Sequence, residues 1–478
     1  MSYSRKTPTI PKQLLVTPRQ LLVLVPFFAT LLGADSARAQ EAKAAGNKDS
    51  AAQETVASSD TRVTSATALG DIFFKSRDSF VFSVTAEEAV YDNLFFSEEA
   101  NKRFDAVSNI SPRIAYQREY QRSTIALDYT LGSRIYHQYD SYNQLAHNGG
   151  LDLHYRLTPR VSFSVGERFS VAPESIRPFE KDMVVDPLQN HIAPNTSLFL
   201  RLNKTLINTA FTDVSYELGR RSGLTLGANS SIMRFTQSNL TDEDRYGAHI
   251  GYSYRLAERT TLNLRYIFNY FELTDSQVNG GITSFVRSPQ LVRTHLAYVG
   301  ITQKLNSSLS GFVNVGPSVT IGNSVNTAQG LRFHPGVRPS IDAGIVLGKA
   351  VSLDPRTFFS FNIGQSTSDG MGIGPVAEVK TAGVSLGRRL SKSITAAITA
   401  NYYHNNFLTD FNSSGQPATT NGIIIGSNLR IGLTDRVFLH ATYNHFRQVS
   451  TASLAAVPGN ILGNIGIVGL SYSIPVFF

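Results

Sequence analysis

Histidine is the first residue type in this chain that could hold a metal ion or transfer a proton. The chain has 10 histidines and no cysteine, which excludes thiolate metal sites, disulfides and cysteine nucleophiles. His440 and His445 are five residues apart, so on one β-strand they point to opposite faces and cannot share a metal ion. His404 follows Tyr402 and Tyr403, which suit a membrane-interface aromatic girdle better than a metal site. We therefore expect no metal and no cofactor.

A serine hydrolase is the second chemistry that the residue types allow. On alternating strands, His154 shares a face with Ser162 and Ser164 of the following strand, which could place a nucleophile beside a base. A wall rich in serine produces such pairs by coincidence, however. The sequence has no G-x-S-x-G elbow, no glycine-rich phosphate loop on a helix and no H-E-x-x-H motif. We therefore predict that the protein is not an enzyme.

Charged residues that alternate with apolar ones could line a polar passage. In several segments, arginines and aspartates lie on the face opposite to the large apolar side chains. A surplus of arginine on such a lining favours anions or acidic sugars. Arg156 and Arg255 share this face but adjoin short turns, where they could equally be hydrated at a rim. The candidate pore-lining residues are Arg134, Arg265, Asp128 and Asp152.

Strands, rather than helices, must position these side chains. Large aliphatic and aromatic residues alternate with small, polar and charged residues in 123–137, 151–157, 245–256 and 262–270. Charged residues make up only 17% of the chain, and the mean hydropathy is close to zero. A transmembrane β-barrel produces such an average, because lipid-facing and lumen-facing residues alternate along every strand. A soluble β-sandwich would also have one apolar and one polar face.

The connections between the alternating segments favour the barrel over the sandwich. Short polar turns such as 157–160, 256–259 and 433–436 alternate with longer and more variable connections. Eight short joins and nine long loops predict eighteen strands, with sixteen as the lower bound. An even strand number, with short turns on one rim and long loops on the other, is typical of bacterial outer-membrane barrels. We therefore predict an all-β fold, an antiparallel transmembrane β-barrel with both ends in the periplasm.

The first 39 residues have the features of a secretory signal peptide. A basic start precedes an apolar stretch at 21–32, and Ala-Arg-Ala at 37–39 forms a cleavage site. An uncleaved membrane anchor is the alternative, but a spanning helix needs roughly 20 apolar residues. Residues 40–70 are small, polar and charged, so we expect a disordered periplasmic linker there. The predicted domains are a signal peptide at 1–39, this linker at 40–70 and an outer-membrane β-barrel at 71–478.

Cleavage would also change the charge of the protein. The signal contains five basic residues and one acidic residue, so its removal lowers the formal net charge from +8 to +4. The rest of the sequence contains no basic stripe with interleaved aromatic residues. A nucleic-acid partner is therefore not expected.

The last residues provide the most specific local signal. Large apolar side chains occupy every second position up to the final residue, as in the β-signal that the barrel-assembly machinery reads. The residues of this predicted assembly signal are Leu470, Tyr472, Ile474, Val476 and Phe478. The alternative is an ordinary edge strand that ends in phenylalanine by chance. Pro475 lies on the other face, and because it has no N–H it is tolerated only near a strand end.

Several segments give the chain a family resemblance. Tyr-Asp-Asn-Leu-Phe at 91–95 follows the first predicted strand, two alternating blocks occupy 123–136 and 147–169, and Leu-Thr-x-Arg turns recur at 157–160 and 433–436. In these features the chain resembles the β-barrel porin family whose members are often encoded near exopolysaccharide genes in Gram-negative bacteria. The resemblance implies an outer-membrane barrel that serves as a channel. The family has no well-defined active site, so the resemblance implies no catalytic residue.

The sequence and this resemblance lead to an expected function. We expect a porin-like channel in the outer membrane of a Gram-negative bacterium, for passive passage of small hydrophilic or saccharide solutes, with exopolysaccharide export as a link seen in some relatives. The alternatives are a non-conducting structural or adhesive barrel and, least favoured, an outer-membrane hydrolase. Expected partners are outer-membrane lipid, lipopolysaccharide, the barrel-assembly machinery and the solutes, and a homo-oligomer is compatible with the sequence. The connection 172–208 is predicted either to fold inward and narrow the pore or to stay on the surface.

Overall fold

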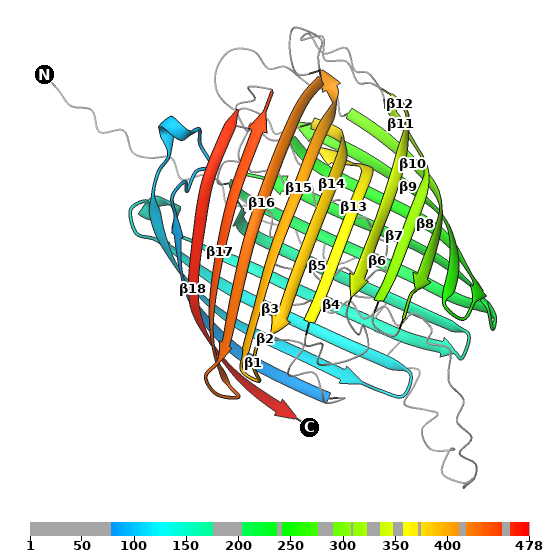
Figure 1. Ribbon diagram of the computed structural model, residues 1–478, viewed down its shortest axis with the longest axis horizontal. Coiled ribbons are helices and arrows are strands. Elements are labelled where there is room, and N and C mark those ends of the chain that lie inside the picture. The colour runs from blue at the N-terminus through cyan, green and yellow to red at the C-terminus, as the bar shows by residue number, and fades with distance from the viewer. Residues whose placement is uncertain are drawn as a thin grey trace, which may run out of the picture. The chain divides into compact units, whose positions relative to one another are not determined.

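The computed structural model describes ten stretches of the chain (Figure 1). They are residues 78–174, 203–236, 241–275, 290–306, 309–322, 335–347, 357–370, 374–410, 417–451 and 459–477. The predicted signal peptide, the predicted linker and Phe478 lie outside these residues, as does most of the connection 172–208. Within the described residues, no helix is long and apolar enough to cross a membrane.

Strands account for nearly all of the described residues. The strands are β1 (Asp78–Tyr91), β2 (Asp105–Glu119), β3 (Ser123–Tyr136), β4 (Gln144–Thr158), β5 (Val161–Glu174), β6 (Asn203–Gly219), β7 (Ser222–Phe235), β8 (Thr241–Ala257), β9 (Thr260–Asp275), β10 (Gln290–Lys304), β11 (Leu309–Gly322), β12 (Gly336–Leu347), β13 (Thr357–Gly370), β14 (Gly374–Arg389), β15 (Ile394–Asp410), β16 (Pro417–Gly432), β17 (Val437–Ser450) and β18 (Asn460–Phe477). Two short 3-10 helices, η1 (Glu99–Asn101) and η2 (Asp140–Tyr142), lie in the connections after β1 and β3.

These strands form one closed antiparallel sheet. Each strand pairs with its neighbours in the sequence, and β1 also pairs with β18, from Ser79 opposite Phe477 to Tyr91 opposite Ile465. Figure 1 shows β18, in red, running beside β1, in blue. Closure pairs the backbone N–H and C=O groups that an open sheet edge would leave without partners. The eighteen-stranded antiparallel barrel predicted from the alternation is therefore confirmed.

The outer and inner faces of the barrel have opposite character. On the outer face, large apolar side chains are exposed at alternate positions, as with Leu127 and Tyr129 on β3 and Ile250 on β8. The intervening residues, which point inward, are mainly small, polar or charged. A soluble protein buries its large apolar side chains, whereas a barrel in lipid presents them outward. The alternation thus separates a lipid-facing surface from a polar interior.

The two rims of the barrel differ in their connections. At the end that we call the short-turn rim, Thr158 accepts hydrogen bonds through Oγ1 from the backbone N–H groups of Arg160 and Val161, at 3.2 and 3.1 Å. Thr434 makes the same two contacts in the turn between β16 and β17. The recurring Leu-Thr-x-Arg pattern is therefore a tight turn whose threonine satisfies two backbone donors. The opposite end, where β1 ends and β2 begins, is the long-loop rim.

Tyrosine and histidine side chains pair on the outer face of the barrel. The hydroxyl of Tyr129 is 2.8 Å from Nδ1 of His147, and the hydroxyl of Tyr266 is 2.7 Å from Nδ1 of His295. Amphipathic rings of this kind are typical of the level at which a membrane barrel meets the lipid headgroups.

One pair of neighbouring strands is joined over only part of its length. β12 pairs with β13 from Ile341 to Leu347. On its other side, β12 stays paired with β11 as far as Gly336. Residues 336–340, nearest the long-loop rim, therefore have a strand partner on one side only. We call this break in the wall the β12–β13 split.

Candidate functional site

The inner face of the barrel is where the charged side chains of interest gather. Directly opposed residues of an antiparallel pair point to the same face, so the register assigns every side chain to the inner or the outer face. All four predicted pore-lining residues have the register of the inner face. They are Asp128 and Arg134 on β3, Asp152 on β4 and Arg265 on β9. That they line an open pore remains a prediction.

Two of these residues belong to one charged cluster on β3 to β5. Arg168 of β5 forms a salt bridge with Asp152, and its Nη1 also donates to the carbonyl of Leu151 at 3.1 Å. Gly150 lies between Asp128 and Arg168 in the register. A Cβ atom at Gly150 would lie 2.8 Å from Asp128 Oδ1 and 2.6 Å from Arg168 Nη1. The glycine therefore makes room for one guanidinium between two carboxylates.

Arg168 was not among the residues predicted from the sequence, although the sequence contains a signal for it. The alternation that puts Ser162 and Ser164 on the inner face continues through Gly166 to Arg168. Extending the pattern over the whole strand would have found the arginine. Its partner could not be found in this way, because the pattern gives the face but not the register between strands.

Arg134 lies beside a different group of polar side chains. Glu87 of β1 accepts a hydrogen bond from Nδ2 of Asn109 at 3.0 Å, and its other oxygen is 3.0 Å from Nε2 of His440. Arg134 is opposite Asn109 in the register of β2 and β3. Glu87 and His440 are 353 residues apart in the sequence, so only closure of the barrel brings them together.

Arg265 faces the interior from another part of the wall. It lies on β9, opposite Gly251 of β8 and Tyr298 of β10. Farther along the wall, Nε2 of His249 on β8 is 3.1 Å from Oδ1 of Asp213 on β6. The four predicted residues are therefore distributed around the interior, and only Asp128 and Asp152 share a cluster.

The connection after β1 is tied to β18 at the long-loop rim. Asp92 accepts hydrogen bonds from the backbone N–H and from Nδ2 of Asn464, both at 2.6 Å. Asn93 donates through Nδ2 to the carbonyl of Leu462 at 3.1 Å, and its Oδ1 accepts from the N–H of Ser97 at 3.0 Å. The Tyr-Asp-Asn-Leu-Phe motif thus has a structural role. We call Asp92, Asn93 and their partners on β18 the latch.

Phe96 continues the latch into the interior. Its φ of 48° lies in the left-handed region, which costs a residue with a Cβ atom some strain. Its side chain is fully buried, and its ring centroid is 4.9 Å from that of Phe446. The cluster around it consists of Tyr403, Ile424, Phe446, Ile461 and Ile465. Burial of the ring offsets the strain and fixes an apolar cluster against the inner face of this part of the wall.

The two consecutive tyrosines predicted for the aromatic girdle have different surroundings. Tyr402 is 46% exposed on the outer face, whereas Tyr403 is 1% exposed and donates from its hydroxyl to Oε1 of Gln448 at 2.9 Å. Consecutive residues of a strand point to opposite faces, so only one of the two can belong to a girdle. The prediction is therefore wrong for Tyr403.

The histidines follow the same rule. His440 points inward to Glu87, whereas His445 points outward, with Nδ1 2.9 Å from Oδ1 of Asn464. The prediction that His440 and His445 face opposite sides is confirmed. In the part of the chain that the structure describes, no three or more histidine, aspartate or glutamate side chains are grouped to hold a metal ion.

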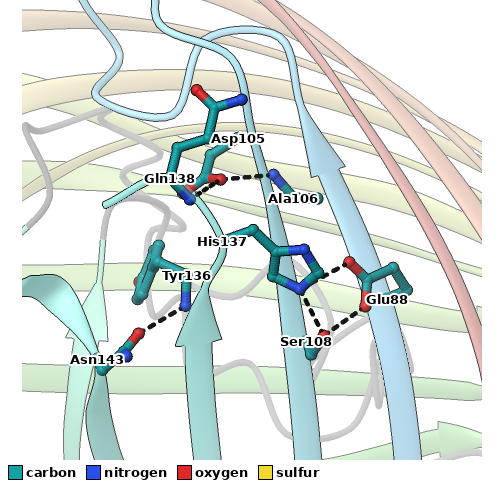
Figure 2. Close-up of polar contacts among 8 residues, drawn as sticks. All are labelled: Glu88, Asp105, Ala106, Ser108, Tyr136, His137, Gln138 and Asn143. Atoms are coloured by element: carbon teal, nitrogen blue, oxygen red, sulfur yellow. Dashed lines mark hydrogen bonds and ion pairs between the residues drawn. The ribbon is translucent and has the colours of Figure 1, made fainter. Parts of the chain in front are cut away.

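Two serine–histidine pairs bear on the hydrolase alternative. Nδ1 of His154 is 3.0 Å from Oγ of Ser164 on the inner face. Figure 2 shows the other pair, in which Ser108 Oγ donates to Glu88 at 2.6 Å and lies 2.8 Å from Nε2 of His137. Glu88 approaches that same nitrogen, at 3.5 Å, whereas the acid of a triad holds the other one. Both serines lie on strands, whose N–H groups are used in the sheet rather than in an oxyanion hole.

Comparison with known proteins gives matches among solved structures only. No protein-family model and no curated protein matches the chain. OccAB3 of Acinetobacter baumannii is 9% identical, with 84% of this chain and 99% of that chain covered and a TM-score of 0.42. OccK2 (OpdF) of Pseudomonas aeruginosa is 10% identical, with 84% and 98% covered and a TM-score of 0.42. The FrpB iron transporter of Neisseria meningitidis is 7% identical, with 83% and 81% covered and a TM-score of 0.43. At such low identity, no residue of these proteins can be matched to a residue of this chain.

The location of the protein follows from its own architecture. A closed antiparallel barrel satisfies its backbone groups internally, and its outer wall exposes large apolar side chains. These are the two conditions for a sheet to cross a bilayer. Bacterial barrels of this kind, with an even number of strands, are found in the outer membrane. The chain is therefore an outer-membrane β-barrel.

Proposed function

We propose that the protein is a porin-like channel of the Gram-negative outer membrane, for the passive passage of small hydrophilic or saccharide solutes. The observation that carries this proposal is the separation of the two faces, with charged and amide side chains inside and exposed apolar side chains outside. A barrel of eighteen strands is wide enough to leave an aqueous passage. In this orientation the short-turn rim faces the periplasm and the long-loop rim faces the outside.

The solutes that fit the lining best are anions and acidic sugars. Arg168 offsets the charge of Asp152 in the cluster that also contains Asp128. Arg134 and Arg265 point inward from separate parts of the wall, and we assign them to the selectivity of the channel. A positive lining raises the local concentration of anions and lowers that of cations.

Swelling of proteoliposomes tests the proposal directly. Liposomes that contain the folded barrel should swell in solutions of small neutral and acidic sugars. An acidic sugar should enter faster than a neutral sugar of the same size. Liposomes with heat-unfolded protein serve as the control. Swelling equal to that of the control would favour the non-conducting structural or adhesive barrel.

Partners of the channel follow from its surface. The apolar outer wall suits outer-membrane lipid and lipopolysaccharide. Leu470 and Tyr472 are exposed on the outer face of β18, where the barrel-assembly machinery would read the terminal signal. A link to exopolysaccharide export rests on the family resemblance alone. Deletion of the gene should then reduce secreted polysaccharide without reducing its synthesis.

A further inference from the structure

The β12–β13 split leaves part of β12 without strand pairing on one side, although Oγ of Ser340 donates to the carbonyl of Gln365 on β13 at 3.0 Å. β12 keeps its pairing with β11 through residues 336–340, but β13 is no longer paired with it there. Val337 lies in this part and is 70% exposed, more than any other large hydrophobic residue of the described chain. Pro339 also lies there, and it has no N–H to leave unpaired at an edge. Among the residues that the structure describes, the paired wall is therefore interrupted here, at the level of the outer leaflet.

The end of β13, which would continue the pairing with β12, lies inside the barrel instead. Ser318 of β11 points inward, and its Oγ is 3.1 Å from Oγ1 of Thr367 on β13. On β14, Val376 packs with Phe271 and Val292, whose register places them on the inner face of β9 and β10. The ends of β13 and β14 thus bend inward and overlap the inner surface of β9 to β12. Together with Leu408, these apolar side chains form a cluster in which each is at most 2% exposed.

A row of charged side chains runs through the split from the outer face to the inner face. Lys380 is half exposed on the outer face, and its Nζ is 3.9 Å from Oε1 of Glu378. Oε2 of Glu378 is 3.8 Å from Nε of Arg338, which has the register of the inner face. Gln365 donates through Nε2 to Glu378 at 2.6 Å. Charged groups in a lipid-facing wall are costly and mark routes for polar groups.

We propose that the β12–β13 split is a lateral opening, through which an anionic amphiphile with one acyl tail passes between the outer leaflet and the interior. Arg338 and Lys380 provide two positive charges against the one carboxylate of Glu378, so the row carries a net positive charge that suits a carboxylate or phosphate headgroup. The apolar cluster of Phe271, Val292, Val376 and Leu408 lies beside the row and suits the tail. Outward movement of the bent ends of β13 and β14 would uncover both surfaces. This route goes beyond the passage of hydrophilic solutes along the barrel axis.

The absence of tryptophan from the chain makes the tail position measurable. In the full barrel refolded in liposomes, Phe271→Trp would report from inside the split, and Val292→Trp offers a second position on the next strand. The probes are dibromostearate, a lysophosphatidylglycerol with a dibrominated tail, and a neutral brominated alkyl maltoside. Either anionic probe should quench the Phe271→Trp emission, and which of them does so identifies the source of the headgroup. Quenching by the maltoside to the same extent would overturn the choice of an anionic headgroup.

Two further tryptophan variants calibrate the quenching. Phe361→Trp lies on the outer face of β13 and should be quenched by every probe. Phe438→Trp lies on the inner face of β17, beside the fully paired β1–β18 junction, and should keep its emission. Equal quenching of Phe438→Trp and Phe271→Trp would show entry along the barrel axis and would overturn the lateral route. The lateral route would also be overturned if neither anionic probe reduced the emission of folded Phe271→Trp.

The absence of cysteine allows the split to be locked. Ser318→Cys with Thr367→Cys places two thiols where hydroxyl oxygens now lie 3.1 Å apart, and a disulfide there would hold β13 against β11. Oxidation should abolish the quenching of Phe271→Trp, and dithiothreitol should restore it. Thr209→Cys with Ser231→Cys, 3.2 Å apart in the continuous wall, is the matched control and should leave quenching unchanged. Quenching that is the same in the locked and reduced forms would contradict the proposal. Because the readout is emission, failure here is distinguishable from failure of sugar passage.

Discussion

The β1–β18 junction and the β12–β13 split differ in how much of their length the two neighbouring strands are paired. β1 and β18 are paired from Ser79 to Tyr91, and Asp92 and Asn93 add the latch at the long-loop rim. β12 and β13 are paired only up to Ile341, and beyond it β13 bends inward. The place where the first and last strands meet is therefore better reinforced than a place between two consecutive strands.

The difference has a physical reason. β1 is the first strand in the chain and β18 is the last. No short connection joins them, so only non-covalent contacts keep the barrel closed between them. β12 and β13 are consecutive, so the chain itself joins them at the end where they are paired, and the barrel stays closed there although their pairing stops at Ile341. A barrel can therefore tolerate a break between consecutive strands at a lower cost than a break at its closure. The contrast predicts different responses to mutation in the two regions.

The largest effect is expected from Phe446→Ala at the closed junction. Phe446 is 1% exposed and packs on Phe96, so its loss leaves a cavity under the latch. The free energy of unfolding in urea, measured in liposomes, should fall by about 3 kcal/mol. Phe361→Ala on the outer face is the control and should cost less, because lipid fills the space. Equal losses in the two variants would argue against a packed core under the latch.

A smaller effect is expected from Asp92→Ala, which removes both side-chain hydrogen bonds to Asn464 and leaves the one from the Asp92 backbone N–H. Loss of two charge-assisted bonds should lower the free energy of unfolding by about 1–3 kcal/mol. Hydrogen exchange should quicken in residues 92–104 and at the start of β18, and not at the split. Unchanged exchange in this region would mean that the latch does not hold the connection.

The smallest effect on stability is expected from Glu378→Gln at the split. Its ion pairs are long, at 3.8 and 3.9 Å, so the free energy of unfolding should change by less than about 1 kcal/mol. Hydrogen exchange should nevertheless quicken at the ends of β13 and β14. Glu167→Gln is the control, because this outer-face acid accepts a bond from Asn208 in the continuous wall. Exchange that changes as much in the control would remove the distinction between split and wall.

Much of the fold could be predicted from the sequence, because period-two alternation is a local property. The strand number follows from the alternation and the turns, since each strand of a barrel repeats the same two faces. The faces of His440 and His445 follow in the same way. The error at Tyr403 came from reading two consecutive residues as one aromatic group. Alternation itself assigns them to opposite faces.

The partners of these side chains could not be predicted, because they depend on register and closure. Nothing local in the sequence links Glu87 of β1 to His440 of β17. The two side chains meet only because β1 and β17 both pair with β18. The contacts at the split depend on the three-dimensional arrangement in the same way. The end of β13 does carry a local signal, because residues 364–370 contain no apolar residue to face lipid. Only the three-dimensional arrangement, however, shows Thr367 beside Ser318. The sequence therefore predicts the faces of the barrel, whereas the structure is needed for the contacts that close it or leave it open.

The most direct test of the central claim is the single-channel current of the purified barrel in a planar lipid bilayer under a salt gradient. A channel with an arginine-bearing interior predicts discrete current steps and a reversal potential that indicates anion preference. Arg134→Ala combined with Arg265→Ala should keep the steps and reduce that preference. Absence of steps from folded protein would contradict the channel, and cation preference in the unaltered protein would contradict the assigned role of the two arginines.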